Sequence, residues 1–382
     1  MANAKRIVVL GCGRVGAVLA EDLAREEAFQ VTVVDRDPAA LAALEQRARV
    51  ATEVADLADA ASVRRLIRPA DLVVGAVPGF LGYQTLELVL EQGKQYADIA
   101  FMPEDYRPLQ ALARERGATA VVDCGVAPGI SNVLLGKCAA EFDTFEQARI
   151  LVGGLPRLRT WPYQYKAPFS PIDVIEEYTR PARYVRNGEV VVMPALSEAE
   201  LVDLPGVGTL EAFNTDGLRS LIRTIPCPDM KELTLRYPGH IELMRVLRES
   251  GFFSTQPLEV KGVSVAPLDL TTRLLFPLWE LQPGEEEFTV LRVQCTGTVG
   301  ATRLRHTWDL LDRGDPVAGH SSMARTTAFP CTIVARLLLA GEIPEPGVFP
   351  PEHLGGQASL TAELFAGLAA RGVTLEQTTE LL

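Results

Sequence analysis

The sequence predicts an α/β fold, with a Rossmann-type, doubly wound parallel sheet and a second α+β domain that holds a mixed or antiparallel sheet. Three observations predict it. Strand-like and helix-like segments alternate over residues 6–122, a glycine-rich turn follows the first strand, and strand-like segments come in succession after residue 129. Alternation is typical of a parallel sheet covered on both faces, whereas successive strands indicate antiparallel or mixed pairing.

The first strand and the turn after it carry the most specific motif. Residues 6–10 are apolar and run into a G-x-G-x-x-G pattern, after which a helix is expected. In this motif the first glycine permits a tight turn, the second lets a pyrophosphate approach the backbone, and the third lets the helix pack on the strand. The helix N-terminus then faces the phosphates. The predicted phosphate-binding residues are Gly11, Gly13, Arg14, Val15 and Gly16.

The second predicted strand, residues 31–34, ends at Asp35. A carboxylate about 20 residues beyond the glycines accepts hydrogen bonds from a ribose diol and repels a 2′-phosphate. Asp35 therefore favours NAD over NADP, although the neighbouring Arg36 is of the residue type that accepts that phosphate.

Four more strands are expected at residues 50–54, 71–77, 96–99 and 118–122, with helices between them. Ligands of such sheets bind beyond the carboxyl ends of the strands. The turn after the third strand predicts adenine contacts, and the next two strand ends predict nicotinamide contacts. These residues are Asp56, Leu57, Val77, Pro78, Gly79, Asp98 and Ile99.

After residue 129 we expect one helix and then strands near residues 148–152, 190–192, 288–293 and 306–310. Residues 322–340 and 360–371 are helical in pattern. The predicted domains are residues 1–128, completed by the C-terminal helices in 322–382, and residues 129–321 for substrate binding, catalysis and dimerisation.

The composition of the chain excludes several classes of function. The net charge of −12 argues against nucleic acid, which requires a basic face. Six scattered cysteines fit reduced thiols in the cytoplasm, and four histidines without ligand spacing predict no metal site. The first strand begins too near Met1 for a signal peptide, and no apolar run reaches the length of a membrane span.

Six runs of residues carry a resemblance to a known family. They lie in order along nearly the whole chain, at residues 122–132 (VDCGVAPGISN), 152–156, 169–178, 208–218, 234–240 and 323–327. With them the chain resembles the saccharopine dehydrogenase family. The segments FSPIDVIEEY, LEAF and PGH are similar to its lysine-oxidising branch.

The resemblance implies NAD-linked oxidative deamination of the L-lysine ε-amine to 2-aminoadipate 6-semialdehyde, which cyclises with its own α-amine. It also implies a homodimer, or a dimer of dimers, formed through the sheet of the second domain. Hydride loss needs the free amine, and a lysine ammonium has a pKa of about 10.4. We therefore expect activity to rise toward alkaline pH.

Three residues are candidates for catalysis. Asp123 follows the sixth strand and either handles the substrate ammonium or serves as a turn or helix-capping residue. His240 ends the LRYPGH segment and is either a base or a buried polar group. Lys166, in an aromatic and proline-rich stretch, is a candidate base or substrate contact.

Arg236 is the candidate clamp for the substrate α-carboxylate, since a guanidinium binds carboxylates in a bidentate manner. An ordinary salt bridge is the alternative. Tyr237 and Tyr165 are the other predicted substrate contacts.

Two other functions remain open. A saccharopine or carboxynorspermidine dehydrogenase would need a pocket for a second carboxylate, and hence a further arginine. Arg180, Arg183, Arg223 and Arg325 are available. A non-catalytic NAD-sensing protein is the alternative of another class, because the N-terminal half also resembles the ligand-binding domains that regulate potassium uptake.

Overall fold

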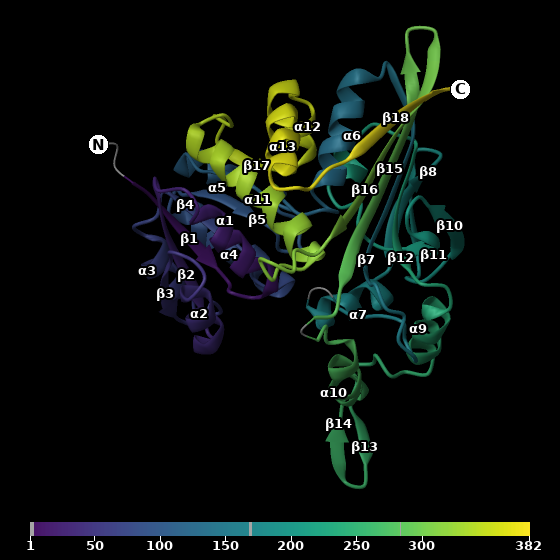
Figure 1. Ribbon diagram of the computed structural model, residues 1–382, viewed down its shortest axis with the longest axis horizontal. Helices are drawn as coiled ribbons and strands as arrows, with labels where there is room; N and C mark the ends of the chain where they lie inside the picture. Colours follow the sequence, from purple (N-terminus) through teal and green to yellow (C-terminus); the bar gives the residue numbers. More distant parts are fainter. Residues whose placement is uncertain (1–3, 168–169, 283) are drawn as a thin grey trace. The chain divides into compact units, whose positions relative to one another are not determined.

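The structure is a computed structural model that describes residues 4–167, 170–282 and 284–382 (Figure 1). The chain forms two compact units. Unit 1 comprises Met1–Ala140 with Ala324–Val373, and unit 2 comprises Glu141–Met323 with Thr374–Leu382. Phe169, part of one run that carried the family resemblance, lies outside the described residues.

Unit 1 contains a fully parallel seven-stranded sheet in the order β3-β2-β1-β4-β5-β6-β17. This is the predicted doubly wound sheet. Its strands are β1 (Lys5–Leu10), β2 (Phe29–Asp35), β3 (Ala51–Val54), β4 (Leu72–Gly75), β5 (Gln95–Asp98), β6 (Thr119–Val121) and β17 (Gly347–Phe349). The order reverses between β1 and β4, and ligands of such sheets bind at that point.

Two helices of unit 1, α2 and α3, begin after aspartates that cap them. Asp37 accepts a hydrogen bond from the backbone N–H of Ala39 before α2, and Asp59 accepts one from Ala61 before α3. The helices are α1 (Arg14–Leu23), α2 (Pro38–Glu45), α3 (Ala60–Ile67), α4 (Gly79–Glu91), α5 (Gln110–Arg116), α6 (Ile130–Glu141), α11 (Ser322–Ala340), α12 (Glu352–Gly355) and α13 (Ala358–Ala370).

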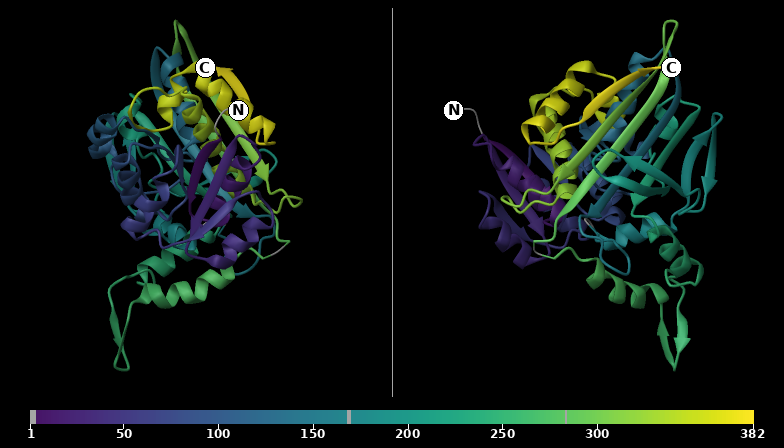
Figure 2. Two further views of the ribbon diagram at one scale, coloured as in Figure 1. Left: turned by 90° about the vertical axis from the view of Figure 1, so that its left-hand side faces the viewer. Right: turned by 45° about the vertical axis from the view of Figure 1, so that its right-hand side comes forward.

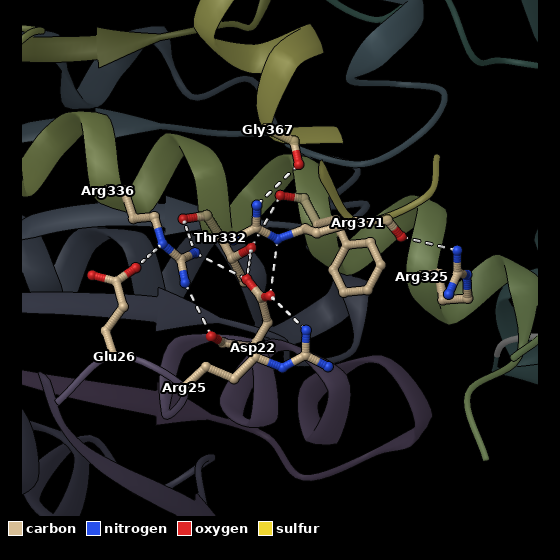
Figure 3. A network of polar contacts seen from close by, with 9 residues as sticks. Asp22, Arg25, Glu26, Arg325, Thr332, Arg336, Gly367 and Arg371 are labelled. Carbon is tan, nitrogen blue, oxygen red and sulfur yellow. Dashed lines mark hydrogen bonds and ion pairs between the residues drawn. The ribbon is translucent and has the colours of Figure 1, made fainter. Parts of the chain in front are cut away.

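A buried carboxylate ties the C-terminal helices to the first helix of the sheet (Figure 3). Asp22 of α1 is 2% exposed and accepts hydrogen bonds from Thr332 at 2.7 Å, Arg336 at 2.9 Å and Arg371 at 2.9 Å. Burial acts to raise the pKa of Asp22, but its bonds to Arg371 and Arg336 outweigh burial and lower that pKa. Residues more than 300 positions apart in sequence are therefore joined around one charge.

The division into units differs from the predicted domains at two places. Helix α6 belongs to unit 1, so the boundary falls after residue 140 instead of residue 128. The last nine residues belong to unit 2, where β18 (Glu376–Leu381) pairs with β16 (Thr302–Arg313). A strand in this segment was not predicted, because residues 376–381 are largely polar. In the structure every one of them is exposed.

Helix α11 is long and apolar enough to span a membrane by length and composition, contrary to the expectation that no such run exists. However, 72% of its 18-residue window is buried inside the protein. Burial of this extent is typical of a core helix, and α11 also holds Thr332 and Arg336 against Asp22.

Unit 2 contains a nine-stranded mixed sheet (Figure 2), as predicted. The main path runs β10-β11-β12-β7-β15-β16-β18, and β8 pairs with both β12 and β9. Within the described part of this sheet, β12 and β7 are parallel neighbours and the other pairs are antiparallel. Its other strands are β7 (Thr144–Pro156), β8 (Ala182–Arg186), β9 (Glu189–Met193), β10 (Glu200–Leu204), β11 (Gly208–Asn214), β12 (Asp229–Arg236) and β15 (Glu287–Val299).

The two faces of β12 have different surroundings. Leu233, Leu235 and Tyr237 point into an apolar cluster with β7 and β15. Alternate residues of a strand point to opposite faces, so Glu232, Thr234 and Arg236 lie on the other face. A second apolar cluster is built from α7 (Pro171–Thr179), α9 (His240–Glu249) and α10 (Pro267–Trp279).

Candidate nucleotide and substrate sites

The glycine-rich turn of unit 1 has the geometry that a pyrophosphate needs. A Cβ atom on Gly11 would lie 2.4 Å from the carbonyl oxygen of Ala76, and one on Gly16 would lie 2.2 Å from that of Gly11. A Cβ on Gly13 would meet nothing within 4 Å. Gly11 and Gly16 are therefore required for close packing, while Gly13 keeps open space before α1. No described side chain caps that end of α1, so its N-terminus can receive an anion.

Asp35 is oriented by the backbone of this turn. One of its carboxylate oxygens accepts a hydrogen bond from the N–H of Cys12 at 2.6 Å, and the other accepts from Asp37 at 2.9 Å. The two bonds fix the carboxylate beside the glycines, where a ribose diol would bind. Arg36 is exposed. Burial, with the charge of Asp35 as the second cause, raises the pKa of Cys12 to about 11, so this thiol stays protonated.

The remaining predicted cofactor residues lie at strand ends of the same sheet. Val77 is buried and Pro78 and Gly79 open helix α4 beside the glycine turn. Asp98 ends β5, and the N–H of Ile99 donates to the carbonyl of Gly75. Asp56 follows β3 and lies near the surface, as does Leu57 beside it.

Asp123 contacts Asp98 through its backbone. Its N–H donates to the Asp98 carboxylate at 3.2 Å, and the next N–H, of Cys124, donates to the Asp98 carbonyl at 2.7 Å. Asp123 has φ of 58° and is 3% exposed, and its carbonyl accepts from Gly125. Its backbone is thus a turn, and α6 begins seven residues later, too far for Asp123 to cap it. Asp98 and Asp123 thus follow neighbouring strands, β5 and β6, and are joined through the backbone N–H of Asp123.

Unit 2 contains a buried polar cluster centred on Arg236, which is 2% exposed. Its Nε donates to the hydroxyl of Tyr178 at 3.2 Å and its Nη2 to the carboxylate of Glu177 at 2.5 Å. Nη2 also lies 3.5 Å from the Tyr165 hydroxyl, and Nη1 donates to the carbonyl of Leu235. The guanidinium stacks on the Tyr165 ring, 4.5 Å from its centre. We name this set, Arg236, Glu177, Tyr178, Tyr165 and His240, the arginine cluster.

His240 is held neutral in the arginine cluster. One ring nitrogen lies 2.8 Å from the carbonyl of Tyr163 and must donate to it, so the other accepts from the Tyr178 hydroxyl at 2.9 Å. Burial, followed by the charge of Arg236, lowers the pKa of His240 to about 3. Burial raises the pKa of Tyr178 to about 12. With both nitrogens in use, His240 has the geometry of a positioning group for Tyr178 and not that of the base suggested by the sequence.

Two predicted residues lie apart from the arginine cluster. Tyr237 points to the opposite face of the sheet, and its hydroxyl donates to the carbonyl of Pro156 at 2.9 Å. Lys166 donates to the carbonyl of Glu280 at 3.0 Å and pairs with Glu285 at 3.3 Å. Tyr237 follows Arg236 directly in the sequence. Because neighbouring residues of a strand point to opposite faces, the sequence alone could have predicted that these two side chains do not share a site.

The sequence analysis did not single out Glu177, Tyr178 or Glu232. The apolar residues Val174 and Tyr178 of α7 are four apart, and Glu177 lies beside them on the inward face, so helical periodicity could have found it. Glu232 accepts hydrogen bonds from Thr215 and from the N–H of Gly217. Burial raises its pKa to about 8. Burial also raises the pKa of Glu177, while the charge and the hydrogen bond of Arg236 act against that rise.

Among the described residues, no group of three or more histidine, cysteine, aspartate or glutamate side chains is arranged to hold a metal ion.

Comparisons with known proteins agree with this geometry. Residues 7–121 match the family model for the saccharopine dehydrogenase NADP binding domain, and residues 125–373 match that for the saccharopine dehydrogenase C-terminal domain. The chain is 22% identical to saccharopine dehydrogenase [NADP(+), L-glutamate-forming] of Schizosaccharomyces pombe, over 97% of this chain and 98% of that one. It is 24% identical to carboxynorspermidine synthase of Vibrio cholerae, over 80% of this chain and 78% of that one.

A solved structure has the same fold. Saccharopine dehydrogenase (L-Glu forming) from Saccharomyces cerevisiae aligns with a TM-score of 0.82 at 19% identity, over 98% of this chain and 100% of that one. Unit 1 binds a pyridine nucleotide, and the second family model argues against a regulatory sensor built from that domain alone. The chain belongs to the saccharopine dehydrogenase family and is an oxidoreductase that acts on an amino-acid amine.

Proposed function

We propose that this enzyme oxidises the ε-amine of L-lysine with NAD and releases 2-aminoadipate 6-semialdehyde, which cyclises. The observation that carries the proposal is the ion pair between Arg236 and Glu177. An α-amino acid carries one carboxylate and one ammonium, and an arginine beside a glutamate presents the complementary charges. Arg236 would bind the α-carboxylate and Glu177 the α-ammonium.

The same pair disfavours saccharopine, which carries additional carboxylates and would require additional cations. Three of the four arginines named above for that task make contacts elsewhere. Arg183 makes two bonds of 2.8 Å to Asp216, and Arg180 pairs with Glu176. Arg325 belongs to unit 1 and donates to the carbonyl of Arg371. The names of the relatives favour saccharopine or carboxynorspermidine as the alternative substrate.

Asp35 supports the choice of NAD. Its carboxylate is fixed by the N–H groups of Cys12 and Asp37, so it cannot swing away from a 2′-phosphate without losing both bonds. The name of the family domain mentions NADP, and the experiment below therefore compares the two cofactors directly.

The residues of unit 1 fit a bound nicotinamide cofactor, which would supply the hydride acceptor. The protein orients the amine and influences its proton. Loss of a hydride from the ε-carbon gives an iminium, and water then replaces the nitrogen, releasing ammonia and the aldehyde. Within unit 1, Asp123 remains the candidate for handling an ammonium group, and its backbone N–H donates to the carboxylate of Asp98.

Cofactor reduction, followed by absorbance at alkaline pH, tests the proposal with NAD or NADP against lysine and saccharopine. Turnover of lysine with NAD supports it. Turnover of saccharopine alone would assign the enzyme to the other branch of the family, and absence of reduction with any amine would reject catalysis on these substrates.

A further inference from the structure

A hairpin and the helix after it form a projecting part of unit 2, which we call the arm (Figure 1). It consists of β13 (Leu258–Val260), β14 (Val263–Val265) and α10. The two strands are antiparallel and joined by Lys261 and Gly262, both with positive φ. A two-residue turn with positive φ at both central residues has the twist that the two strands of a hairpin require.

One face of the hairpin is apolar. Leu258 pairs with Val265 and Val260 with Val263, and paired residues point to the same side. All four apolar side chains therefore share one face, while Glu259 and Ser264 occupy the other. Leu258, Val260 and Val263 are 58%, 55% and 60% exposed. A two-stranded hairpin without a third strand or a helix against it is marginally stable in water, so this face requires a cover.

Helix α10 presents a second uncovered stripe. Thr271, Leu275 and Trp279 are buried against unit 2. Leu270, Leu274 and Leu278, also spaced four residues apart, are each more than half exposed. Side chains four apart lie on one side of a helix, so they form a continuous apolar row. Contiguous exposed apolar surface of this kind marks an interaction site.

The charges of the arm indicate what covers it. Two acidic residues, Glu259 and Asp269, and two basic residues, Lys261 and Arg273, lie within it. In the described part of the chain none of the four takes part in an ion pair. The chain as a whole has a net charge of −12, which repels a second copy, but the arm is balanced. Equal numbers of acids and bases on one patch allow each acid to face a base of the same patch on a second copy across a two-fold axis.

We propose that the arm is an interaction surface for a second copy of this chain. In a two-fold arrangement the same patch contributes from both protomers, so the apolar hairpin face and the leucine row of one copy cover those of the other. The acidic residues of each arm then meet the basic residues of its counterpart. The proposal is independent of the substrate and of the cofactor.

Light scattering after size-exclusion chromatography of the full chain tests it with two variants of opposite charge. The positive variant carries Glu259→Lys and Asp269→Lys, and the negative variant carries Lys261→Glu and Arg273→Glu. Each variant alone is expected to have half the mass of the wild-type assembly at the same concentration. An equimolar mixture should regain the wild-type mass, since opposite arms attract whatever the detailed pairing.

A control variant carries Glu342→Lys and Glu363→Lys, which change the net charge as the positive variant does but lie on exposed positions of unit 1. It should keep the wild-type mass. A monomeric wild type would overturn the proposal, as would variants that keep the full mass. Loss of mass that mixing does not restore would also overturn it, because misfolding and not charge would then be the cause.

Discussion

Nη2 of Arg236 donates to the carboxylate of Glu177 at 2.5 Å, which joins the last residue of β12 to helix α7 within unit 2. Removing one partner of a fully buried ion pair leaves an uncompensated charge and costs about 3–5 kcal/mol; this value is an upper bound here, because the Glu177 side chain is 23% exposed. The pair is thus held by the fold, and it is the pair to which we assign the amino-acid head group in our proposal.

We predict that Glu177→Gln keeps the shape of the cluster but lowers kcat/KM for lysine by about 100-fold. A hydrogen bond to a charged group is worth about 1.5–3 kcal/mol, and 1.4 kcal/mol is a factor of about ten. Because Arg236 then lacks its anion, glutarate should inhibit the variant more strongly than the wild type. Steady-state kinetics check both effects. Glu176→Gln is the control, since Glu176 is exposed and pairs with Arg180; equal effects of the two substitutions would contradict the assignment.

Replacing Asp35 with serine should shift the cofactor preference. The variant loses the carboxylate that opposes a 2′-phosphate, so the ratio of kcat/KM for NADP over NAD should rise roughly 10- to 100-fold, or about 1.4–2.8 kcal/mol. Asp37→Ser serves as control, because Asp37 caps α2 and serine is also a good cap. An unchanged ratio in the Asp35 variant would show that this carboxylate does not choose the cofactor.

The rate with lysine should rise about tenfold per pH unit from neutral pH toward the pKa of the substrate ammonium, about 10.4. His240 does not titrate in this range, since its pKa is lowered to about 3. His240→Phe should therefore reduce kcat without moving the pH profile. A pH-independent rate between pH 7 and pH 10, or a profile displaced in the variant, would count against this account.

The stability of unit 2 should depend on pH through Glu232. Its pKa rises from an ordinary value of 4.5 to about 8 in the folded state. Below pH 4.5 the carboxyl is protonated in both the folded and the unfolded state, so folding is not penalised. As pH rises to 8 the unfolded state ionises first, so the free energy of unfolding falls, by at most roughly 1.4 kcal/mol for each pH unit between the two pKa values.

Glu232→Gln should flatten this slope between pH 5 and pH 8. Denaturant unfolding of the two proteins at several pH values measures it. If the difference between them stays constant with pH, Glu232 is not the group responsible.

Asp22→Ala should destabilise unit 1 by about 3–5 kcal/mol, because Arg336 and Arg371 lose their shared carboxylate in a largely buried position. Since the pKa of Asp22 is lowered in the fold, its contribution is present above the ordinary value of 3.8 and is lost as pH falls through the folded pKa. Thermal unfolding checks the effect. Arg25→Ala is the comparison; its side chain is 61% exposed and 4.0 Å from Asp22, so about 0.5 kcal/mol or less is expected.

Local sequence was sufficient to predict the first six strands of the parallel sheet, because they are short apolar runs next to glycines and caps whose conformations depend on near neighbours. The same holds for the nucleotide turn, where Gly11, Gly13 and Gly16 lie within six residues of one another. The sequence also predicted the mixed second sheet and placed Arg236, Tyr165 and His240 among the candidates that the fold brings together. It did not predict β17, which joins the parallel sheet beside β6 from more than 200 residues further along the chain.

The partners of the buried polar side chains, in contrast, depend on the tertiary structure. Glu177 and Arg236 are 59 residues apart, and Asp22 and Arg371 are 349 apart, so no local pattern relates them. Strand alternation sent Tyr237 to the opposite face from Arg236, and burial made His240 a poor proton acceptor. Hydrogen bonds and desolvation act through space, and that is why the chemistry of these residues could not be derived from their order along the chain.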